Sequence, residues 1–133
     1  MFEPHGRTYP FEDESRIDPS ILETFPYAEP GKDLEIVIET EEFTVVCPYS
    51  GLPDFGKVTI VYVPDKDCIE LRSLKYYLLS FRNVGIFQEH VTRRMLNDLV
   101  AVCKPNRMTV TVDYNIRGGI HTTCKAEYRR EES

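Results

Sequence analysis

Residues 34–47 are rich in Ile, Val and Thr; side chains alternate with a period of two along residues 34–39, and again along residues 58–63. A period of two is typical of strands that bury one face. Pro64 and Asp65 end the second segment, and a loop rich in turn-forming residues separates the two segments. The pattern therefore predicts an antiparallel hairpin with a long connecting loop.

The spacing of apolar residues becomes helical in the middle of the chain. One helical face carries Leu71, Leu74, Leu78 and Phe81. A second face carries Phe87, Val91, Met95, Leu99 and Val102. Two consecutive helices are predicted. Residues 83–85 supply a stop signal for the first helix, and Pro105 ends the second.

Alternation with a period of two returns in residues 108–114 and 120–128, with Arg-Gly-Gly at 117–119 between them. Either a turn or a glycine bulge joins these strands. The predicted order is strand, strand, helix, helix, strand, strand. An α+β fold satisfies it, with a four-stranded antiparallel sheet and both helices on one face. Because closure removes exposed edges, several copies are expected to assemble into a barrel.

Residues 1–33 are rich in proline and charge and show no clear period. We predict an extended arm that packs on the domain or on a neighbouring copy, with one helical turn at residues 19–24. A partly disordered tail is the open alternative for residues 1–15. Residues 34–133 are long enough for a single domain with its own core.

Composition argues against several classes of protein. The 133 residues include 16 basic and 22 acidic side chains, a formal net charge of −6. Duplex-binding domains usually carry a basic surplus, so no direct nucleic-acid partner is expected. No apolar run approaches the roughly 20 residues that span a bilayer. The N-terminus has no apolar leader segment, so a cytoplasmic protein without membrane contact is expected.

Residues that often bind metals are scattered along the chain. The four cysteines are Cys47, Cys68, Cys103 and Cys124. The three histidines are His5, His90 and His121. Neither set shows the spacing of a zinc site, so no metal is predicted. Reduced thiols are favoured over two disulfides, because no secretion signal is visible and the core is of adequate size.

The segment Cys-Pro-Tyr-Ser-Gly-Leu-Pro-Asp-Phe at residues 47–55 is the first candidate site. A thiolate is a natural nucleophile and a carboxyl group can donate a proton, so Cys47 and Asp54 are candidate catalytic residues. Because a free thiol has a pKa of about 8.5, a basic group or a helix N-terminus must favour the thiolate. The sequence does not show which. The competing interpretation is a buried cysteine followed by an ordinary turn.

Other charged residues are candidates for binding. Glu89 begins the second helix, where either the helix dipole or a ligand with two parallel N–H donors explains it. Arg72 and Lys75 share one side of the first helix and could contact phosphates or simply face solvent. Arg117 beside two glycines is another phosphate candidate. No Gly-x-Gly-x-x-Gly occurs, so any dinucleotide would need a different, intersubunit site.

Three segments together resemble one known family. They are residues 47–55, residues 70–77 (Glu-Leu-Arg-Ser-Leu-Lys-Tyr-Tyr) and residues 81–89 (Phe-Arg-Asn-Val-Gly-Ile-Phe-Gln-Glu). They resemble motifs of the short-chain NADPH-dependent 7-cyano-7-deazaguanine reductases, and the resemblance runs from about Leu22 to about Tyr128. That family reduces a nitrile to an amine in queuosine biosynthesis, a tRNA modification. Its members are ring-like homo-oligomers, such as decamers, of tunnelling-fold units.

The resemblance implies a role for each candidate. Residues 34–133 would be one tunnelling-fold catalytic domain, in which Cys47 forms a covalent thioimide and Asp54 donates a proton. The deazaguanine substrate would contact Ile69, Glu70, Leu71, Gln88 and Glu89. The cofactor would be NADPH, with the binding candidates Arg72, Lys75 and Arg117.

Two residues depart from the family pattern, and two rival functions stay open. Arg72 stands where the family usually has lysine, and Gln88 stands where it usually has histidine. Glutamine can form hydrogen bonds but cannot shuttle a proton. The first rival is a related amidinotransferase that acts on a tRNA-borne nitrile. The second is a non-catalytic tunnelling-fold protein that binds a purine or pterin.

Overall fold

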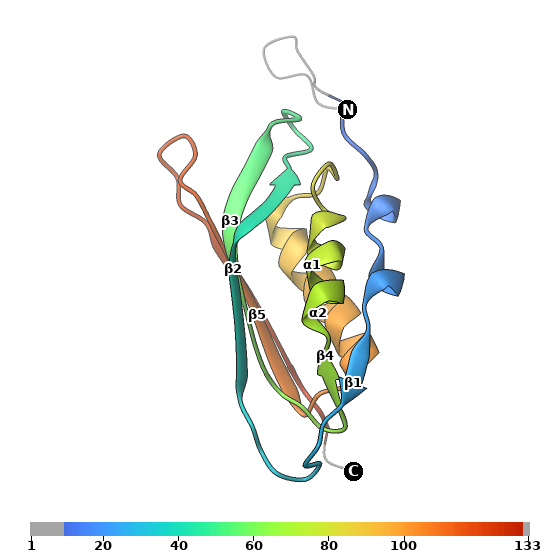
Figure 1. The fold of residues 1–133 in the computed structure, drawn as a ribbon. Coiled ribbons are helices and arrows are strands. Elements are labelled where there is room, and N and C mark those ends of the chain that lie inside the picture. The colour runs from blue at the N-terminus through green and yellow to red at the C-terminus, as the bar shows by residue number, and fades with distance from the viewer. Residues whose placement is uncertain (1–9, 132–133) are drawn as a thin grey trace.

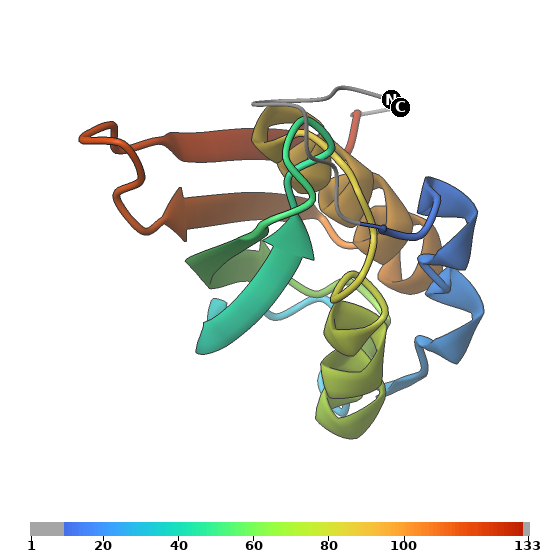
Figure 2. The ribbon, with the colours of Figure 1, turned by 90° about the horizontal axis from the view of Figure 1, so that it is seen from above.

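The computed structural model describes residues 10–131 of the chain. Four strands form one antiparallel sheet in the order β2-β3-β5-β6. They are β2 Ile36–Val46, β3 Pro53–Val63, β5 Arg107–Tyr114 and β6 Thr123–Arg129. Helices α1 Leu71–Leu79 and α2 Gln88–Cys103 lie together on one face of this sheet (Figure 1, Figure 2). The predicted α+β class with an antiparallel sheet is confirmed.

The core lies between the sheet and the two helices. Even-numbered residues of the central strands face it and are at most 1% exposed: Val58, Ile60, Tyr62, Met108, Val110 and Val112. Their odd-numbered neighbours Thr59, Val61 and Thr109 are only half-buried on the other face. The alternation predicted for these two strands is confirmed, and burial of this apolar area provides the main stabilisation of the fold.

Strand β2 contains a β-bulge that the sequence pattern did not predict. Thr40 pairs with Val58, and the next pair joins Phe43 to Gly56. Strand β2 therefore uses one more residue than β3 over this step, which moves the following side chains to the opposite face. Beyond the bulge, the odd-numbered Phe43 and Val45 are buried. The alternation predicted for residues 34–39 therefore does not continue with the same parity past the bulge.

Two short strands are absent from the predicted order. β1 Thr24–Pro26 and β4 Asp67–Ile69 form a separate antiparallel sheet. Three residues are too few to show a period, so no sequence pattern predicted these strands. The observed strand and helix order is β1, β2, β3, β4, α1, α2, β5, β6. Since β4 leads directly into α1, this pairing ties the N-terminal segment to the start of that helix (Figure 1).

The N-terminal segment packs on the helices through two 3-10 turns. These are η2 Glu14–Arg16 and η3 Pro19–Ile21. The second confirms the helical turn predicted at residues 19–24. Ile17 and Leu22 are 2% and 6% exposed and belong to the hydrophobic core. The segment therefore contributes apolar area to the domain that it covers (Figure 1).

Backbone hydrogen bonds fix this segment further toward its start. The Glu12 N–H donates to Asn83 O at 2.7 Å, and the Gly85 N–H donates to Glu12 O at 2.9 Å. The disordered alternative for residues 1–15 is therefore wrong from residue 10 onward. Residues 1–9 lie outside the described part of the chain.

Helix α1 begins at a side-chain cap and ends earlier than predicted. The Glu70 carboxylate accepts hydrogen bonds from the backbone N–H groups of Arg72 at 2.6 Å and Ser73 at 2.9 Å. Such a cap satisfies donors that the first helical turn leaves without partners. The helix ends at Leu79, so the expected extension to Phe81 is wrong.

Helix α2 ends where the sequence predicted. Lys104 follows Cys103 with a left-handed φ of 47°, and Pro105 comes next. Proline cannot continue a helix, so the predicted stop is confirmed. Across residues 10–131, no helix has both the length and the apolar character needed to cross a bilayer.

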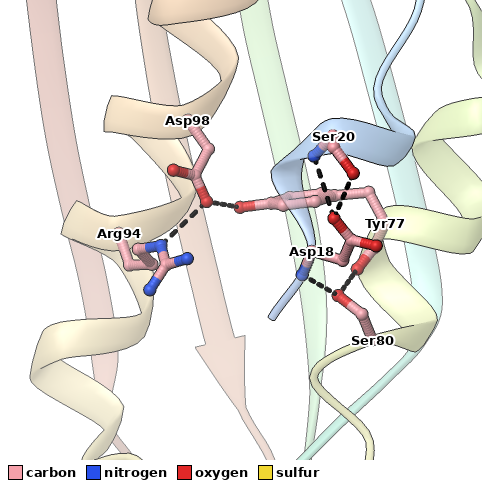
Figure 3. Close-up of polar contacts among 6 residues, drawn as sticks. All are labelled: Asp18, Ser20, Tyr77, Ser80, Arg94 and Asp98. Carbon is pink, nitrogen blue, oxygen red and sulfur yellow. Dashed lines mark hydrogen bonds and ion pairs between the residues drawn. The ribbon is translucent and has the colours of Figure 1, made fainter. Parts of the chain in front are cut away.

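A polar network joins the two helices and the N-terminal segment (Figure 3). The Tyr77 hydroxyl of α1 donates to Asp98 Oδ2 of α2 at 2.6 Å, and Arg94 Nε donates to the same oxygen at 2.9 Å. Ser80 Oγ donates to Tyr77 O at 2.6 Å and accepts from the Asp18 N–H at 3.2 Å. Because Tyr77 is fully buried, its hydroxyl requires such a partner.

Candidate active site

Cys47 follows the last residue of β2 and opens a compact loop. Its N–H donates to Leu52 O at 2.9 Å, and its carbonyl accepts from the Gly51 N–H at 2.8 Å. Gly51 has a φ of 74°, which glycine adopts without the penalty that a side chain brings. The compact loop after Cys47 is confirmed, and the thiol residue is only 8% exposed.

Asp54 lies in a strand and not in the loop. β3 starts at Pro53, so the expected start near residue 58 is wrong and the connecting loop is shorter than predicted. Asp54 pairs with Val45 and has the same parity as the buried even-numbered residues of β3. Its side chain is therefore directed to the helix-covered face, and the residue is 5% exposed. The bulge in β2 gives Cys47, two residues beyond Val45, the parity of that same face.

The segment between the helices brings the start of α2 to this end of the sheet. The Val46 N–H donates to Val84 O at 3.0 Å, and the Ile86 N–H donates to Val46 O at 3.1 Å. Gln88 and Glu89, the first two residues of α2, follow directly. The Gln88 side chain forms a hydrogen bond with Asp54. The predicted position of Glu89 at the start of the second helix is confirmed.

Arg117 reaches the same place from the loop between β5 and β6. Gly118 and Gly119 have φ values of 61° and 78°, and the backbones of Arg117 and Ile120 exchange two hydrogen bonds. Positive φ at both central residues is typical of a type I′ hairpin turn, which sets the position of Arg117. The turn alternative for residues 117–119 is confirmed. The Arg117 guanidinium forms an ion pair with Asp54.

A hydrogen bond from Arg117 is also the first of the influences that lower the pKa of the Cys47 thiol. Sequence reasoning required a basic group to favour the thiolate but did not identify it. Arg117 supplies that group from a position 70 residues further along the chain. Its double glycine suggested a tight turn, but no local signal showed which residues the turn would face.

The environment moves the pKa values of the two acidic groups toward each other. Burial raises the pKa of the Cys47 thiol, but hydrogen bonds from Arg117 and from the loop residues outweigh it, so the pKa is lowered. Burial raises the pKa of Asp54 and dominates, although the charge of Arg117 and a hydrogen bond from Gln88 oppose it. The negative charge of Glu89 adds to the increase. The site therefore makes the thiol more acidic and the carboxyl group less acidic than usual.

The remaining predicted site residues form a second group at the start of α1. They are Ile69, Glu70, Leu71, Arg72 and Lys75. Helix α1 starts beside β4, at the far end of the molecule from the loop after β2 (Figure 1). The Glu70 carboxylate is already engaged by the helix backbone, and the Ile69 side chain is 2% exposed in the core. The structure thus brings five of the predicted residues together and leaves these five apart.

A groove of about 380 Å³ runs between α1 and β2. Its walls are mainly apolar and include Leu71, Leu74, Leu78, Ile38 and Phe43. Lys75 and Arg82 also line it. Arg72, one helical turn before Lys75, is exposed at the start of the same helix. The second group therefore combines an apolar floor with positive charge.

Among residues 10–131, the histidines and other metal-ligating side chains do not gather into a site. His121 pairs with the exposed Asp113 carboxylate, and His90 packs its ring edge-to-face against Phe87 with centroids 6.2 Å apart. Within the described range, no group of three or more His, Cys, Asp or Glu side chains could hold a metal ion. His5 lies among the residues that the structure does not describe.

Fold and site together define a small antiparallel α+β protein whose buried thiol and carboxyl group share one guanidinium. Comparison with known proteins places the chain in a family. A family model described as QueF-like protein matches residues 53–133. An NADPH-dependent 7-cyano-7-deazaguanine reductase of Chlorobaculum tepidum is 53% identical over 116 residues, covering 87% of this chain and 99% of the relative. The chain belongs to the QueF-like family.

Further relatives agree with this assignment. A protein of Thermomicrobium roseum with the same name is 54% identical over 109 residues, which cover 82% of this chain and 85% of the relative. The crystal structure of the archaeosine synthase QueF-Like in the apo form matches with a TM-score of 0.68. The match covers 74% of this chain and 96% of the archaeosine synthase chain. Because the two sequences are only 23% identical, this likeness concerns the fold alone.

Proposed function

We propose that this chain is an NADPH-dependent nitrile reductase that converts 7-cyano-7-deazaguanine to 7-aminomethyl-7-deazaguanine in queuosine biosynthesis. The observation that carries the proposal is the buried pair Cys47 and Asp54, joined by Arg117. It occurs in a chain 53% identical to a curated reductase over nearly the whole length of that relative. A thiol with a lowered pKa and a carboxyl group with a raised pKa suit attack on a nitrile.

In the proposed reaction, the Cys47 thiolate attacks the nitrile carbon and a covalent thioimide forms. The new S–C bond uses the sulfur electron pair, and the nitrile nitrogen takes a proton from Asp54. Burial raises the pKa of Asp54, which favours its protonated form. Only 5% exposure also limits access of water to the carboxyl group.

Glu89 is the strongest candidate for recognition of the deazaguanine ring. Its carboxylate is exposed on the first turn of α2, beside Gln88, which contacts Asp54. A carboxylate accepts two parallel N–H bonds, the pattern that a guanine-like edge presents. The carboxylate of Glu70 is less suited, because two backbone N–H groups already occupy it. Ile69, Glu70 and Leu71 would then contact the ring with backbone or apolar atoms.

The groove between α1 and β2 fits a phosphate-bearing cofactor. Lys75 and Arg82 border its apolar walls, and Arg72 extends the positive charge by one helical turn. Point charges of this kind attract phosphate groups, and arginine can bind them through two donors at once. Arg72 and Lys75 would hold the phosphates of NADPH, which supplies hydride when bound. Arg117 is the weaker candidate for this role, because its guanidinium is engaged by Asp54.

We further propose that each site is completed by a second copy of the chain in a tunnelling-fold barrel. Helix α1 starts beside β4, away from the loop after β2 in one molecule, and a neighbouring copy could bring the start of α1 to that loop (Figure 1). Strands β2 and β6 are the edges of the four-stranded sheet and can pair with neighbouring copies. The four free cysteines fit the reduced environment of the cytoplasm, where we place the protein.

The decisive experiment follows NADPH absorbance with 7-cyano-7-deazaguanine in the wild type and in Cys47→Ala. Intact mass is measured in parallel without NADPH. Substrate-dependent NADPH loss that disappears in Cys47→Ala, with a mass adduct on the wild type, is expected. An adduct without NADPH loss would contradict the reductase and favour the amidinotransferase. No adduct and no turnover would remove the catalytic role of Cys47 and favour a binding protein.

Mixing two inactive variants tests the shared site. Cys47→Ala and Lys75→Ala each lack one half of the proposed site. If one copy supplies Cys47 and its neighbour supplies Lys75, mixed assemblies regain activity at roughly a quarter of their sites by random pairing. No recovery after verified subunit exchange would mean that both halves come from the same chain.

A further inference from the structure

The segment that joins α1 to α2 is bound along both of its edges. We call residues 83–86 the helix linker. Along its inner edge, the Val46 N–H donates to Val84 O at 3.0 Å, and the Ile86 N–H donates to Val46 O at 3.1 Å. Val46 is the last residue of β2, and Cys47 follows it. This edge therefore joins the helix linker to the backbone directly before the thiol.

The outer edge of the helix linker is held by the N-terminal segment. The Glu12 N–H donates to Asn83 O at 2.7 Å, and the Gly85 N–H donates to Glu12 O at 2.9 Å. Successive backbone groups of an extended segment point to alternate edges, so one edge can pair with Glu12 while the other pairs with β2. Both pairings are parallel bridges. The helix linker is thus the middle member of three short segments that lie side by side.

Phe11 packs on the outer side of this arrangement. Its ring lies so close to Gly85 that a Cβ there would overlap the ring carbons Cγ, Cδ2 and Cε2. Glycine is therefore needed at this position because it allows the close approach of the ring. On the inner side, Val84 and Ile86 are 0% and 3% exposed and belong to the core. The Phe11 ring and the core hold the helix linker from two sides.

The position of the helix linker decides how Cys47 and Glu89 lie relative to each other. It is bonded to Val46, directly before Cys47, and it continues through Phe87 into Gln88 and Glu89 at the start of α2. In the proposed reaction Cys47 attacks the nitrile while Glu89 holds the ring, so their relative position sets the geometry of attack. A misplacement of about 1 Å can slow such a step about 100-fold. A contact that fixes the helix linker therefore acts on the rate of attack.

We propose that Phe11 is a positioning residue, which together with the Glu12 backbone holds the helix linker against the end of β2 and so places Glu89 relative to Cys47. The proposal rests on the function proposed above and adds the N-terminal segment to the parts of the chain that shape its site. Phe11 acts through the packing of its ring on Gly85, and it contributes no group to the reaction itself.

The first test follows amide hydrogen exchange without nitrile or NADPH. Mass spectrometry of fragments that cover residues 84–89 reports the Ile86 N–H, which donates to Val46 O. In Phe11→Ala this amide should exchange about tenfold faster, because loss of the ring frees the outer edge of the helix linker. Phe11→Leu keeps an apolar side chain, and its exchange rate should lie between those of Phe11→Ala and the wild type. Unchanged exchange in Phe11→Ala would overturn the proposal.

The second test measures formation of the Cys47 adduct in a single turnover with 7-cyano-7-deazaguanine, again without NADPH. Phe11→Ala should slow adduct formation at saturating nitrile at least about tenfold. Affinity for the nitrile, measured in the Cys47→Ala background, should change little, because the carboxylate of Glu89 is kept. Faster exchange with an unchanged adduct rate would contradict the positioning role. If the wild type forms no adduct, the proposed function fails, and the exchange test still decides whether Phe11 holds the helix linker.

Ile17→Ala is the matched control for stability. Ile17 belongs to the same N-terminal segment and is 2% exposed in the core, but the pairing with the helix linker is made by Glu12. Ile17→Ala should lower the melting temperature. Well below that temperature, its exchange at Ile86 and its adduct rate should stay near those of the wild type. If Ile17→Ala changed both rates as much as Phe11→Ala, the segment would act through stability alone and the proposal would be wrong.

Discussion

The guanidinium of Arg117 lies against the carboxylate of Asp54, which is the second residue of β3. The two residues are 63 positions apart in the chain. Burial raises the pKa of Asp54 even though this cation opposes the increase. The carboxylate is thus held in a place that suits catalysis better than it suits the stability of the fold.

Asp54→Asn is expected to lower activity and raise stability at neutral pH. Loss of the proton donor lowers turnover at least about 100-fold. The raised folded-state pKa means that the folded chain binds its proton more tightly than the unfolded chain. The stability from Asp54 is therefore complete below about pH 3.9, the unfolded pKa, and is lost as pH rises through the folded pKa. Thermal unfolding of both proteins across pH should show the advantage of Asn growing as pH rises.

Asp113→Asn provides a control of opposite sign. The pKa of the exposed Asp113 is lowered, first by its hydrogen bond with His121 and then by that with Thr123. Its contribution to stability is therefore present above the unfolded pKa and lost as pH falls through the folded pKa. Asp113→Asn should reduce the melting temperature slightly at neutral pH and not in acid. A parallel response of the two variants would contradict the sign of the Asp54 shift.

Gln88→His introduces the histidine that the family usually has at this position, directly before Glu89. Gln88 forms a hydrogen bond with Asp54 but cannot carry a proton. Histidine can do both, so turnover should increase and become pH-dependent between about pH 5 and 8. Adduct formation by Cys47 should change little. Steady-state rates across this range provide the measurement, with Gln88→Asn as an amide control. If His and Asn behave alike, proton transfer at this position is not limiting.

Tyr77→Phe should destabilise the fold without a direct effect on the site. The buried hydroxyl donates to Asp98 at 2.6 Å, and its loss leaves that carboxylate with Arg94 alone among the contacts of Figure 3. A hydrogen bond to a charged group contributes about 1.5–3 kcal/mol. Urea unfolding should show a loss of this size. Tyr76→Phe is the matched control, because Tyr76 is 54% exposed on the same helix. Equal losses in the two variants would argue against the Asp98 bond.

Gly85→Ala should loosen the contact between the N-terminal segment and the segment that joins α1 to α2. A Cβ at Gly85 would lie 2.1 Å from the nearest ring atom of Phe11. Overpacking of this kind costs about 1–3 kcal/mol. Combining it with Phe11→Ala should remove most of the penalty, which a double-mutant cycle in urea measures. Additive losses would show that the clash is relieved in another way.

Cys47 and its loop illustrate what sequence reasoning could find. The apolar run before it, together with Pro48, Gly51 and Pro53, is local information, and local backbone preferences act on it directly. The bulge in β2 was not predictable in this way. It adds one residue between Thr40 and Phe43. Nothing in the residue types there marks it, yet it gives Cys47 the parity of the buried face.

The sequence by itself determined the antiparallel α+β class, both helices, a turn or bulge at residues 117–119 and Cys47 with Asp54 as candidates. Periodicity and turn chemistry act over a few residues, so they can be read along the chain. Only the tertiary structure decided that Arg117 meets both acidic groups and that the α1 residues lie apart from them. Contacts between distant residues depend on strand register, on the bulge and on how the sheet and helices pack. These follow from burial of the whole core, and no local segment encodes them.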